Sequence, residues 1–303
     1  MNISSTVQRV RVRVFENRVL GERLRSLVLE APEVARRVLP GQFIQLDCHP
    51  SLTLLRPFSI MNADPEKGTV EIFYQVVGVG TRAMATWSKD HETWILGPLG
   101  SHFTAPGPGE RAMLVAGGVG LAPLRFLAHR LHMQQIPVTL LWGIEAEKIP
   151  FATVSAFGGV GVDVVENPLV LAQEAAMGIV TCLASAQKRE GFFHGLVSDL
   201  MDRVLEVGTG LGLRPRLYVC GPTAMMAAVA GLAQKWALRG EVSLEGHMAC
   251  GLGGCAGCAV PVVQGDGWRY VRSCTEGPVL PLDQVLWDVP MVHAGGCSTK
   301  RGT

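Results

Sequence analysis

The chain of 303 residues has almost no net charge, because 27 Lys and Arg residues balance 26 Asp and Glu residues and leave a formal charge of +1. A protein that attracts nucleic acid or an anionic membrane through its overall field usually has a large excess of positive charge. We therefore expect neither nucleic acid nor a membrane surface as its partner.

Long apolar runs are also missing. No stretch reaches the roughly 18 apolar residues that cross a bilayer, and the first ten residues have no apolar run after a basic start. The eight cysteines then stand in a chain without an evident secretion signal, where clustered thiols favour a metal site over disulfides. We expect a cytoplasmic protein with no membrane span.

Internal repeats and low-complexity segments are absent, while Gly is abundant at 36 residues and 48% of the chain is hydrophobic. A globular chain of this length favours two or three modules. Residues 1–104 read as an antiparallel β-barrel, since Val10, Val12 and Val14 alternate with arginines and further apolar runs are separated by turn residues. These runs are 24–29, 42–47, 58–61 and 69–77, with a short helix at 83–87.

Residues 105–240 change to apolar strands that alternate with helical patterns, which predicts a doubly wound α/β domain with a parallel sheet. Such sheets bind ligands at the carboxyl ends of their strands. The expected strands are 112–116, 138–142, 162–165, 179–184 and 217–220. The expected helices are 123–133, 168–177, 196–204 and 223–236.

We expect residues 241–287 to form a small third module, followed by a loose tail at 288–303. Its cysteines are Cys250, Cys255, Cys258 and Cys274. They are separated by four residues, by two residues and by a longer interval, which is the spacing of a plant-type 2Fe-2S site. The glycine-rich intervening loop can wrap a cluster and direct backbone N–H groups at its sulfurs. A structural zinc site is the alternative, although zinc more often uses two Cys pairs of equal short spacing.

A flavin signature is predicted in the barrel. Arg56, Pro57, Phe58 and Ser59 occur where a strand should begin; Arg56 could bind a pyrophosphate and Ser59 could hydrogen-bond an isoalloxazine ring. Gly80 and Thr81 open a short helix that could face a phosphate. The alternative for the first motif is an ordinary strand edge with a surface arginine.

A nucleotide site is predicted where a glycine turn joins a strand to a helix, at Gly117, Gly118, Val119 and Gly120. The turn lacks the Gly-x-Gly-x-x-Gly spacing, so its meaning depends on its place after the barrel. A second turn, Cys220, Gly221 and Pro222, ends the last strand near the expected nicotinamide position. Most free cysteines are small buried apolar residues, and this is the alternative for Cys220.

From about residue 7 to residue 287, these motifs in this order resemble the ferredoxin-NADP reductase superfamily. Within it they are similar to the electron-transfer subunits of two-subunit, NAD-linked dihydroorotate dehydrogenases. The stretch that runs from Ser243 through Met248 to Cys250 carries much of this resemblance.

The resemblance implies a 2Fe-2S cluster on the four clustered cysteines and FAD on the barrel motifs, with Phe73, Tyr74 and Gln75 added to the FAD contacts. It also implies NAD or NADP as the nucleotide, and a hetero-oligomer with an FMN-containing catalytic subunit, in pyrimidine biosynthesis. Ser59 and Cys220 would orient flavin and nicotinamide, and hydride transfer needs no general acid or base. Alternatives are the related subunits of a sulfide dehydrogenase, an NADH-dependent ferredoxin-NADP oxidoreductase or a hydrogenase, and a non-enzymatic zinc module.

One segment departs from the pattern of the family. Where its members usually have an acidic stretch after the fourth strand, this chain has Ser185, Lys188 and Arg189. Hydroxyl and cationic groups suit a ribose 2′-phosphate, so the sequence favours acceptance of NADP. Lys188 and Arg189 can equally be solvated surface charges.

Overall fold

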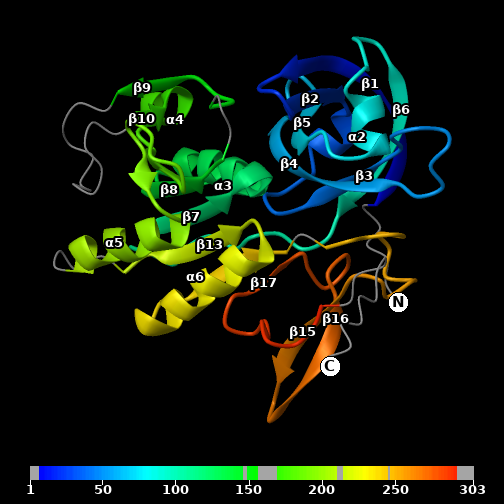
Figure 1. The fold of residues 1–303 in the computed structure, drawn as a ribbon. Helices are drawn as coiled ribbons and strands as arrows, with labels where there is room; N and C mark the ends of the chain where they lie inside the picture. Colours follow the sequence, from blue (N-terminus) through cyan, green and yellow to red (C-terminus); the bar gives the residue numbers. More distant parts are fainter. Residues whose placement is uncertain (1–6, 146–148, 156–168, 210–213, 245, 292–303) are drawn as a thin grey trace, which may run out of the picture.

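A computed structural model of the chain describes residues 7–145, 149–155, 169–209, 214–244 and 246–291. A closed β-barrel and a parallel sheet with helices stand side by side, and a small module with a projecting hairpin lies beneath the barrel (Figure 1). Among the described residues, no helix is long and apolar enough to cross a membrane. The predicted combination of barrel, doubly wound domain and small C-terminal module is confirmed.

The barrel has six strands in the order β1-β2-β5-β4-β3-β6, and each strand is antiparallel to its neighbours. The strands are β1 (Gln8–Val19), β2 (Leu24–Glu30), β3 (Phe43–Leu46), β4 (Arg56–Asp64), β5 (Thr69–Gln75) and β6 (Glu92–Leu99). Two short helices, α1 (Pro32–Ala35) and α2 (Val79–Met84), lie between strands.

The alternation at the start of β1 explains its two faces. Val12 and Val14 are buried in the barrel core, while Arg11 and Arg13 on the other face both pair with Glu92 of β6. Successive residues of a strand point to opposite faces, so one apolar face and one charged face follow from the sequence. The prediction of a half-buried strand here is confirmed.

The nucleotide domain is built on a seven-stranded sheet in the order β12-β11-β8-β7-β13-β14-β17, in which β17 alone is antiparallel to its neighbour. Its strands are β7 (Ala112–Gly117), β8 (Val138–Gly143), β11 (Val180–Ser185), β12 (Phe193–His194), β13 (Arg216–Cys220), β14 (Gly240–Ser243) and β17 (Val279–Pro281). A separate two-stranded sheet pairs β9 (Thr153–Ser155) with β10 (Leu169–Leu171).

Helices cover both faces of this sheet. The turn η1 (Gly118–Gly120) leads into α3 (Leu121–Met133), which packs between the sheet and β4 of the barrel. The opposite face is covered by α5 (Val197–Thr209) and α6 (Thr223–Lys235), and α4 (Ala172–Ala176) follows β10. Because helices cover both faces of the sheet, a ligand is expected at the carboxyl ends of its parallel strands.

Two expected helices differ from the structure in detail. The helix expected at 83–87 is α2, which begins earlier because the Thr81 hydroxyl caps its first turn through the amide of Gly78. The helix expected at 168–177 begins with strand β10, because its apolar residues pair with β9; only α4 is helical. The strand expected at 162–165 lies outside the described residues. The boundary placed at residue 241 falls within β14, so the sheet extends into the third module.

The third module consists of the cysteine loop and a hairpin of β15 (Ala259–Gln264) and β16 (Gly267–Arg272). Its own apolar core is small. Met248, Cys258 and Cys274 pack with Phe43 and Leu99 on the outside of the barrel. The module therefore depends on the barrel for part of its packing.

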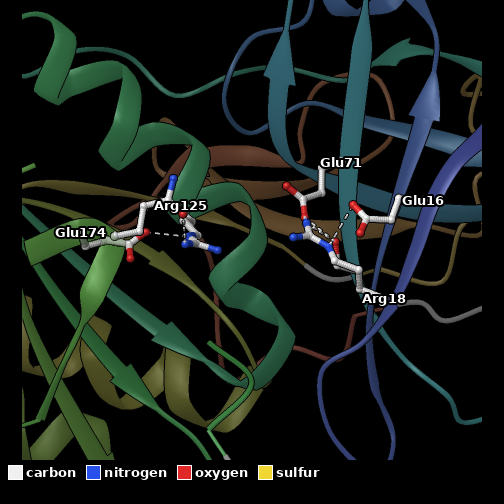
Figure 2. Close-up of polar contacts among 7 residues, drawn as sticks. Glu16, Arg18, Glu71, Arg125 and Glu174 are labelled. Carbon is white, nitrogen blue, oxygen red and sulfur yellow. Dashed lines mark hydrogen bonds and ion pairs between the residues drawn. The ribbon is translucent and has the colours of Figure 1, made fainter. Parts of the chain in front are cut away.

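Ion pairs lie on both sides of the contact between barrel and nucleotide domain (Figure 2), and the pair on the nucleotide side is buried while the pairs on the barrel side are partly exposed. On the nucleotide side, Arg125 of α3 donates to Glu174 of α4 at 2.5 Å, and His129 also contacts Glu174 at 3.0 Å. On the barrel side, Arg18 pairs with Glu71 and Glu16. A cavity of about 150 Å³ between the two groups is lined by Arg18, Glu71, Arg125 and Glu174.

We predict that Glu174→Gln lowers stability by about 3–5 kcal/mol near neutral pH, because Arg125 would keep its charge in a buried site without the carboxylate that neutralises it. Burial raises the pKa of Glu174, but the hydrogen bond with His129 and the charge of Arg125 outweigh it and lower the pKa to about 2. A depressed folded-state pKa gives stability that is complete above the ordinary value of 4.5 and is lost as the pH falls towards 2.

Urea unfolding of both proteins between pH 7 and pH 2 measures this effect. The stability difference should shrink through that acidic window. Glu33→Gln is the control, because Glu33 pairs with Arg36 and Arg37 on the surface and should contribute little. A difference that stays constant down to pH 2 would contradict the assignment.

Candidate active site: two adjoining cavities and a cysteine loop

The first cavity, of about 300 Å³, opens between the barrel, α3 and the cysteine module. Predicted residues that line it are Pro57, Phe58, Ser59, Phe73, Tyr74, Gln75, Thr81 and Val119. Further lining residues were not predicted: Phe43, Val77, Ala122, Leu244, Gly246, Met248 and Pro278. Its walls are mostly apolar and aromatic, with Ser59, Gln75 and Thr81 as polar groups, which suits a flat aromatic ring with a polar edge.

Adjacent barrel strands fix the aromatic part of this wall. Tyr74 on β5 is buried and meets Phe58 on β4 edge to face, with ring centroids 6.1 Å apart. The Tyr74 hydroxyl donates to the Asn17 side chain at 3.4 Å, and burial raises the pKa of Tyr74 to about 12. Tyr74 is therefore a neutral, fixed wall of the cavity.

Two predicted flavin residues do not line this cavity. Arg56 donates to the carbonyls of Leu54 at 2.9 Å and Leu55 at 3.3 Å, which holds its guanidinium against its own loop. Gly80 is buried, and a Cβ there would lie 3.1 Å from that of Cys48. The roles of Arg56 and Gly80 in binding the cofactor stay predictions.

The second cavity, of about 510 Å³, runs along the carboxyl ends of the parallel strands. Predicted residues that line it are Gly117, Gly118, Val119 and Pro222. Residues that the prediction missed are Leu24, Gly143, Ile144, Glu145, Ala184, Gly195, Leu196, Val197, Ser198, Ala224, Met225 and Ala228. The sequence could have indicated Gly143 and the residues next to it. Gly143 ends β8 just as the predicted Gly117 ends β7, and a glycine at the end of a parallel strand is a sign of a nucleotide site.

The two predicted glycine turns pack directly against each other. A Cβ on Gly120 would lie 2.4 Å from the backbone oxygen of Cys220, and one on Gly117 would lie 2.7 Å from Cδ of Pro222. The buried indole of Trp142 on β8 donates to the carbonyl of Gly118 at 2.9 Å. The second glycine turn and the Trp142 indole therefore fix the backbone of the turn at 117–120, and the absence of side chains at its glycines lets a ligand approach that backbone.

Cys220 ends β13 beside these turns, but its side chain is 1% exposed and packs in the core between the sheet and α3. Neither cavity is lined by Cys220. Its role in orienting nicotinamide stays a prediction, whereas Ser59 does line the first cavity.

The two cavities meet, since Gln75 and Val119 line both of them. A ring in the barrel cavity and a ring at this end of the strand-edge cavity would share these two side chains as walls. Direct hydride transfer needs two such rings in contact, and the arrangement of the cavities provides for it.

The four clustered cysteines lie as two pairs. The thiol of Cys250 is hydrogen-bonded to that of Cys255, and the thiol of Cys258 to that of Cys274. Backbone amides also point at the sulfurs: Leu252 N lies 3.4 Å from Cys250 Sγ, and Gly253 N lies 3.2 Å from Cys274 Sγ. Among the described residues, no three or more potential ligands stand together in a group that could hold a metal ion. The structure thus brings the thiols together in pairs, and one site for a 2Fe-2S cluster on all four cysteines stays a prediction.

The electrostatics of these thiols differ from those of the other cysteines. The hydrogen bond from Cys274 lowers the pKa of Cys258 to about 5, while that of Cys274 is raised. Burial raises the pKa of Cys48 to about 12 and that of Cys182 to about 11. Metals are bound by the thiolate form of cysteine. Cys48 and Cys182, whose raised pKa values keep them protonated, therefore act as buried apolar side chains, and the candidate ligands are the cysteines of the loop.

Phe43 and Met248 connect the barrel cavity to the cysteine loop. Both line the cavity, and both pack in one apolar cluster with Cys258 and Cys274. These two side chains therefore join the wall of the cavity to the apolar packing around Cys258 and Cys274.

Residues 245–286 match the family model described as the iron-sulfur cluster binding domain of dihydroorotate dehydrogenase B. The chain is also similar to proteins named dihydroorotate dehydrogenase B (NAD(+)), electron transfer subunit. The protein from Desulforamulus reducens is 33% identical, covering 86% of this chain and 91% of its own length. The protein from Caldanaerobacter subterraneus subsp. tengcongensis is 32% identical, covering 92% and 99%.

Solved structures show the same fold. An NADH-dependent reduced ferredoxin-NADP oxidoreductase aligns with a TM-score of 0.71 at 23% identity, covering 91% of this chain and 90% of that one. A ferredoxin NADP+ reductase from Neisseria gonorrhoeae, solved with bound FAD and NADP, aligns with a TM-score of 0.57 at 16% identity, covering 75% and 91%.

Proposed function

Because this chain belongs to the family of electron transfer subunits of dihydroorotate dehydrogenase B, we propose that it carries electrons between a catalytic partner and a nicotinamide nucleotide. The carriers are FAD in the barrel cavity and a 2Fe-2S cluster on Cys250, Cys255, Cys258 and Cys274. One observation supports this most: Phe43 and Met248, which line the barrel cavity, belong to the same apolar cluster as Cys258 and Cys274.

The side chains of this chain would bind and orient the carriers. Pro57, Phe58 and Tyr74 form the apolar walls against the flavin ring, and Ser59 offers a hydroxyl to its polar edge. Gln75 and Val119 would hold the nicotinamide against that ring, and Ser59, which lines the barrel cavity, is the proposed orienting group for the flavin. Cys220 would act on the nicotinamide through its place at the end of β13, because its thiol is buried in the core. Bound FAD supplies the conversion between hydride transfer and single-electron transfer.

The proposed partner is an FMN-containing dihydroorotate dehydrogenase catalytic subunit, which gives a hetero-oligomer in pyrimidine biosynthesis. Electrons from dihydroorotate would enter through the cluster, where Cys255 is exposed, and leave as hydride to the nucleotide. A cytoplasmic location goes with this proposal, because free thiols that hold a cluster suit a reducing compartment.

The visible spectrum, FAD content and iron content of anaerobically purified protein test the proposal. We expect about one FAD and two irons per chain, and bleaching of the flavin band when NADH is added. Colourless protein that takes up neither iron nor flavin on reconstitution would overturn it, and zinc without flavin would favour a structural metal site.

Co-purification from the native cell tests the partner separately. A partner that binds FMN and orotate supports the pyrimidine assignment. A partner with several iron-sulfur clusters would instead assign the chain to another electron-transfer complex. That result would not contradict FAD and the 2Fe-2S cluster as the carriers.

A further inference from the structure

Glu145 lies two residues beyond β8 and lines the strand-edge cavity with a carboxylate. Its Oε1 accepts from the backbone N–H of Ala186 at 2.5 Å, and its Oε2 accepts from the hydroxyl of Ser185 at 3.1 Å. The side chain therefore ties the end of β8 to the end of β11 and lines the cavity at the same time.

The layout of the cavity indicates which part of a dinucleotide would reach Glu145. Gln75 and Val119 mark the end shared with the barrel cavity, where nicotinamide belongs under the proposed function. Gly118 lies at the turn after β7, where a pyrophosphate would bind. The next strand in the sheet is β8, so the adenosine ribose of a dinucleotide bound in this way would come beside Glu145. An acidic group at the end of the second strand is the usual partner of a ribose 2′-hydroxyl in such sheets.

The charged side chains around the strand-edge cavity also favour a nucleotide without a 2′-phosphate. Among the described residues that line this cavity, Glu145 is the one charged side chain. Lys188 is exposed, the guanidinium of Arg189 lies 4.5 Å from the centroid of the Phe192 ring, and neither lines the cavity. The hydroxyl of Ser185, which the sequence offers to a 2′-phosphate, already donates to Glu145.

From this geometry we propose that Glu145 sets the nucleotide specificity: its carboxylate accepts a hydrogen bond from the 2′-hydroxyl of NAD and repels the 2′-phosphate of NADP. The inference rests on the proposed function, since it places the nicotinamide end of the cavity at the flavin. It replaces the expectation that Ser185, Lys188 and Arg189 select NADP. Two anionic groups in contact, with no cation among the described residues that line the cavity, disfavour the phosphorylated nucleotide.

Calorimetric titration of the purified full-length chain with ADP-ribose and with 2′-phospho-ADP-ribose tests the proposal. Both probes lack nicotinamide, so binding is measured without hydride transfer. We expect the wild type to bind ADP-ribose at least about tenfold more tightly than its 2′-phosphate, and Glu145→Gln to tighten binding of the 2′-phosphate by about tenfold. Glu145→Arg should reverse the preference. Glu190→Gln removes an exposed carboxylate that does not line the cavity and should change neither affinity.

The outcomes separate this inference from the proposed function. Equal affinity of the wild type for both probes, or an unchanged ratio in both Glu145 variants, overturns the role of Glu145 and leaves the electron carriers untouched. A flavin- and iron-loaded wild type that binds neither probe overturns the nucleotide half of the proposed function together with this inference. If Glu145→Gln fails to retain flavin, the ratio in Glu145→Arg decides.

Discussion

Cys258→Ser should lose its iron, with the iron content per FAD falling by more than about tenfold relative to wild type. Cys258 is 3% exposed, and its thiol is hydrogen-bonded to that of Cys274. A serine hydroxyl keeps the volume of this position but stays protonated, so one of the two ligand pairs is broken. Iron and acid-labile sulfide analysis, together with the visible spectrum, measures the loss.

Cys182→Ala is the matched control, because Cys182 is also a buried thiol but packs in the core of the parallel sheet. It should retain both iron and flavin. The Cys258→Ser protein should keep FAD and still oxidise NADH with an artificial dye, while electron transfer to the catalytic partner falls with the iron. Full iron content in Cys258→Ser would contradict its assignment as a ligand.

The sequence motifs predicted best those parts of the site that are built from residues close together in the chain. Within β4, Pro57, Phe58 and Ser59 line the cavity together, as the motif predicted. The spacing of the cysteines predicted one site on four thiols, whereas the structure brings the thiols together in pairs. Such short segments form their geometry locally, so their residue types carry the information. The predicted family and the predicted iron-sulfur domain are confirmed by the relatives and by the domain match.

The sequence could not predict contacts that join distant segments. Phe43 and Met248 are some 200 residues apart and meet only because the cysteine module packs on the outside of the barrel. Glu145 reaches Ser185 because β8 and β11 are neighbours in the sheet, a register that no local motif contains. Likewise Cys220 is at the predicted strand end, but the packing against α3 turns its thiol into the core.

Gly120→Ala should destabilise the nucleotide domain by about 3 kcal/mol or more and weaken nucleotide binding by at least about tenfold. A Cβ there would lie 2.4 Å from the oxygen and 2.6 Å from the carbonyl carbon of Cys220. These are backbone atoms of a strand paired on both sides, so they cannot move aside as the end of a flexible side chain could. The clash can be relieved only if the two glycine turns move apart. That movement would displace the backbone that is expected to bind the pyrophosphate.

Gly231→Ala separates this clash from a general effect of replacing glycine. Gly231 lies in α6, and a Cβ there would have no atom within 4 Å, so alanine should stabilise the helix by about 0.5–1 kcal/mol. Thermal unfolding and titration with ADP-ribose measure both variants. If Gly120→Ala matched Gly231→Ala in both measurements, the close packing of the two turns would not control the nucleotide site. A loss of binding with unchanged stability would instead mean that the turns separate at little cost and that their shape serves the ligand alone.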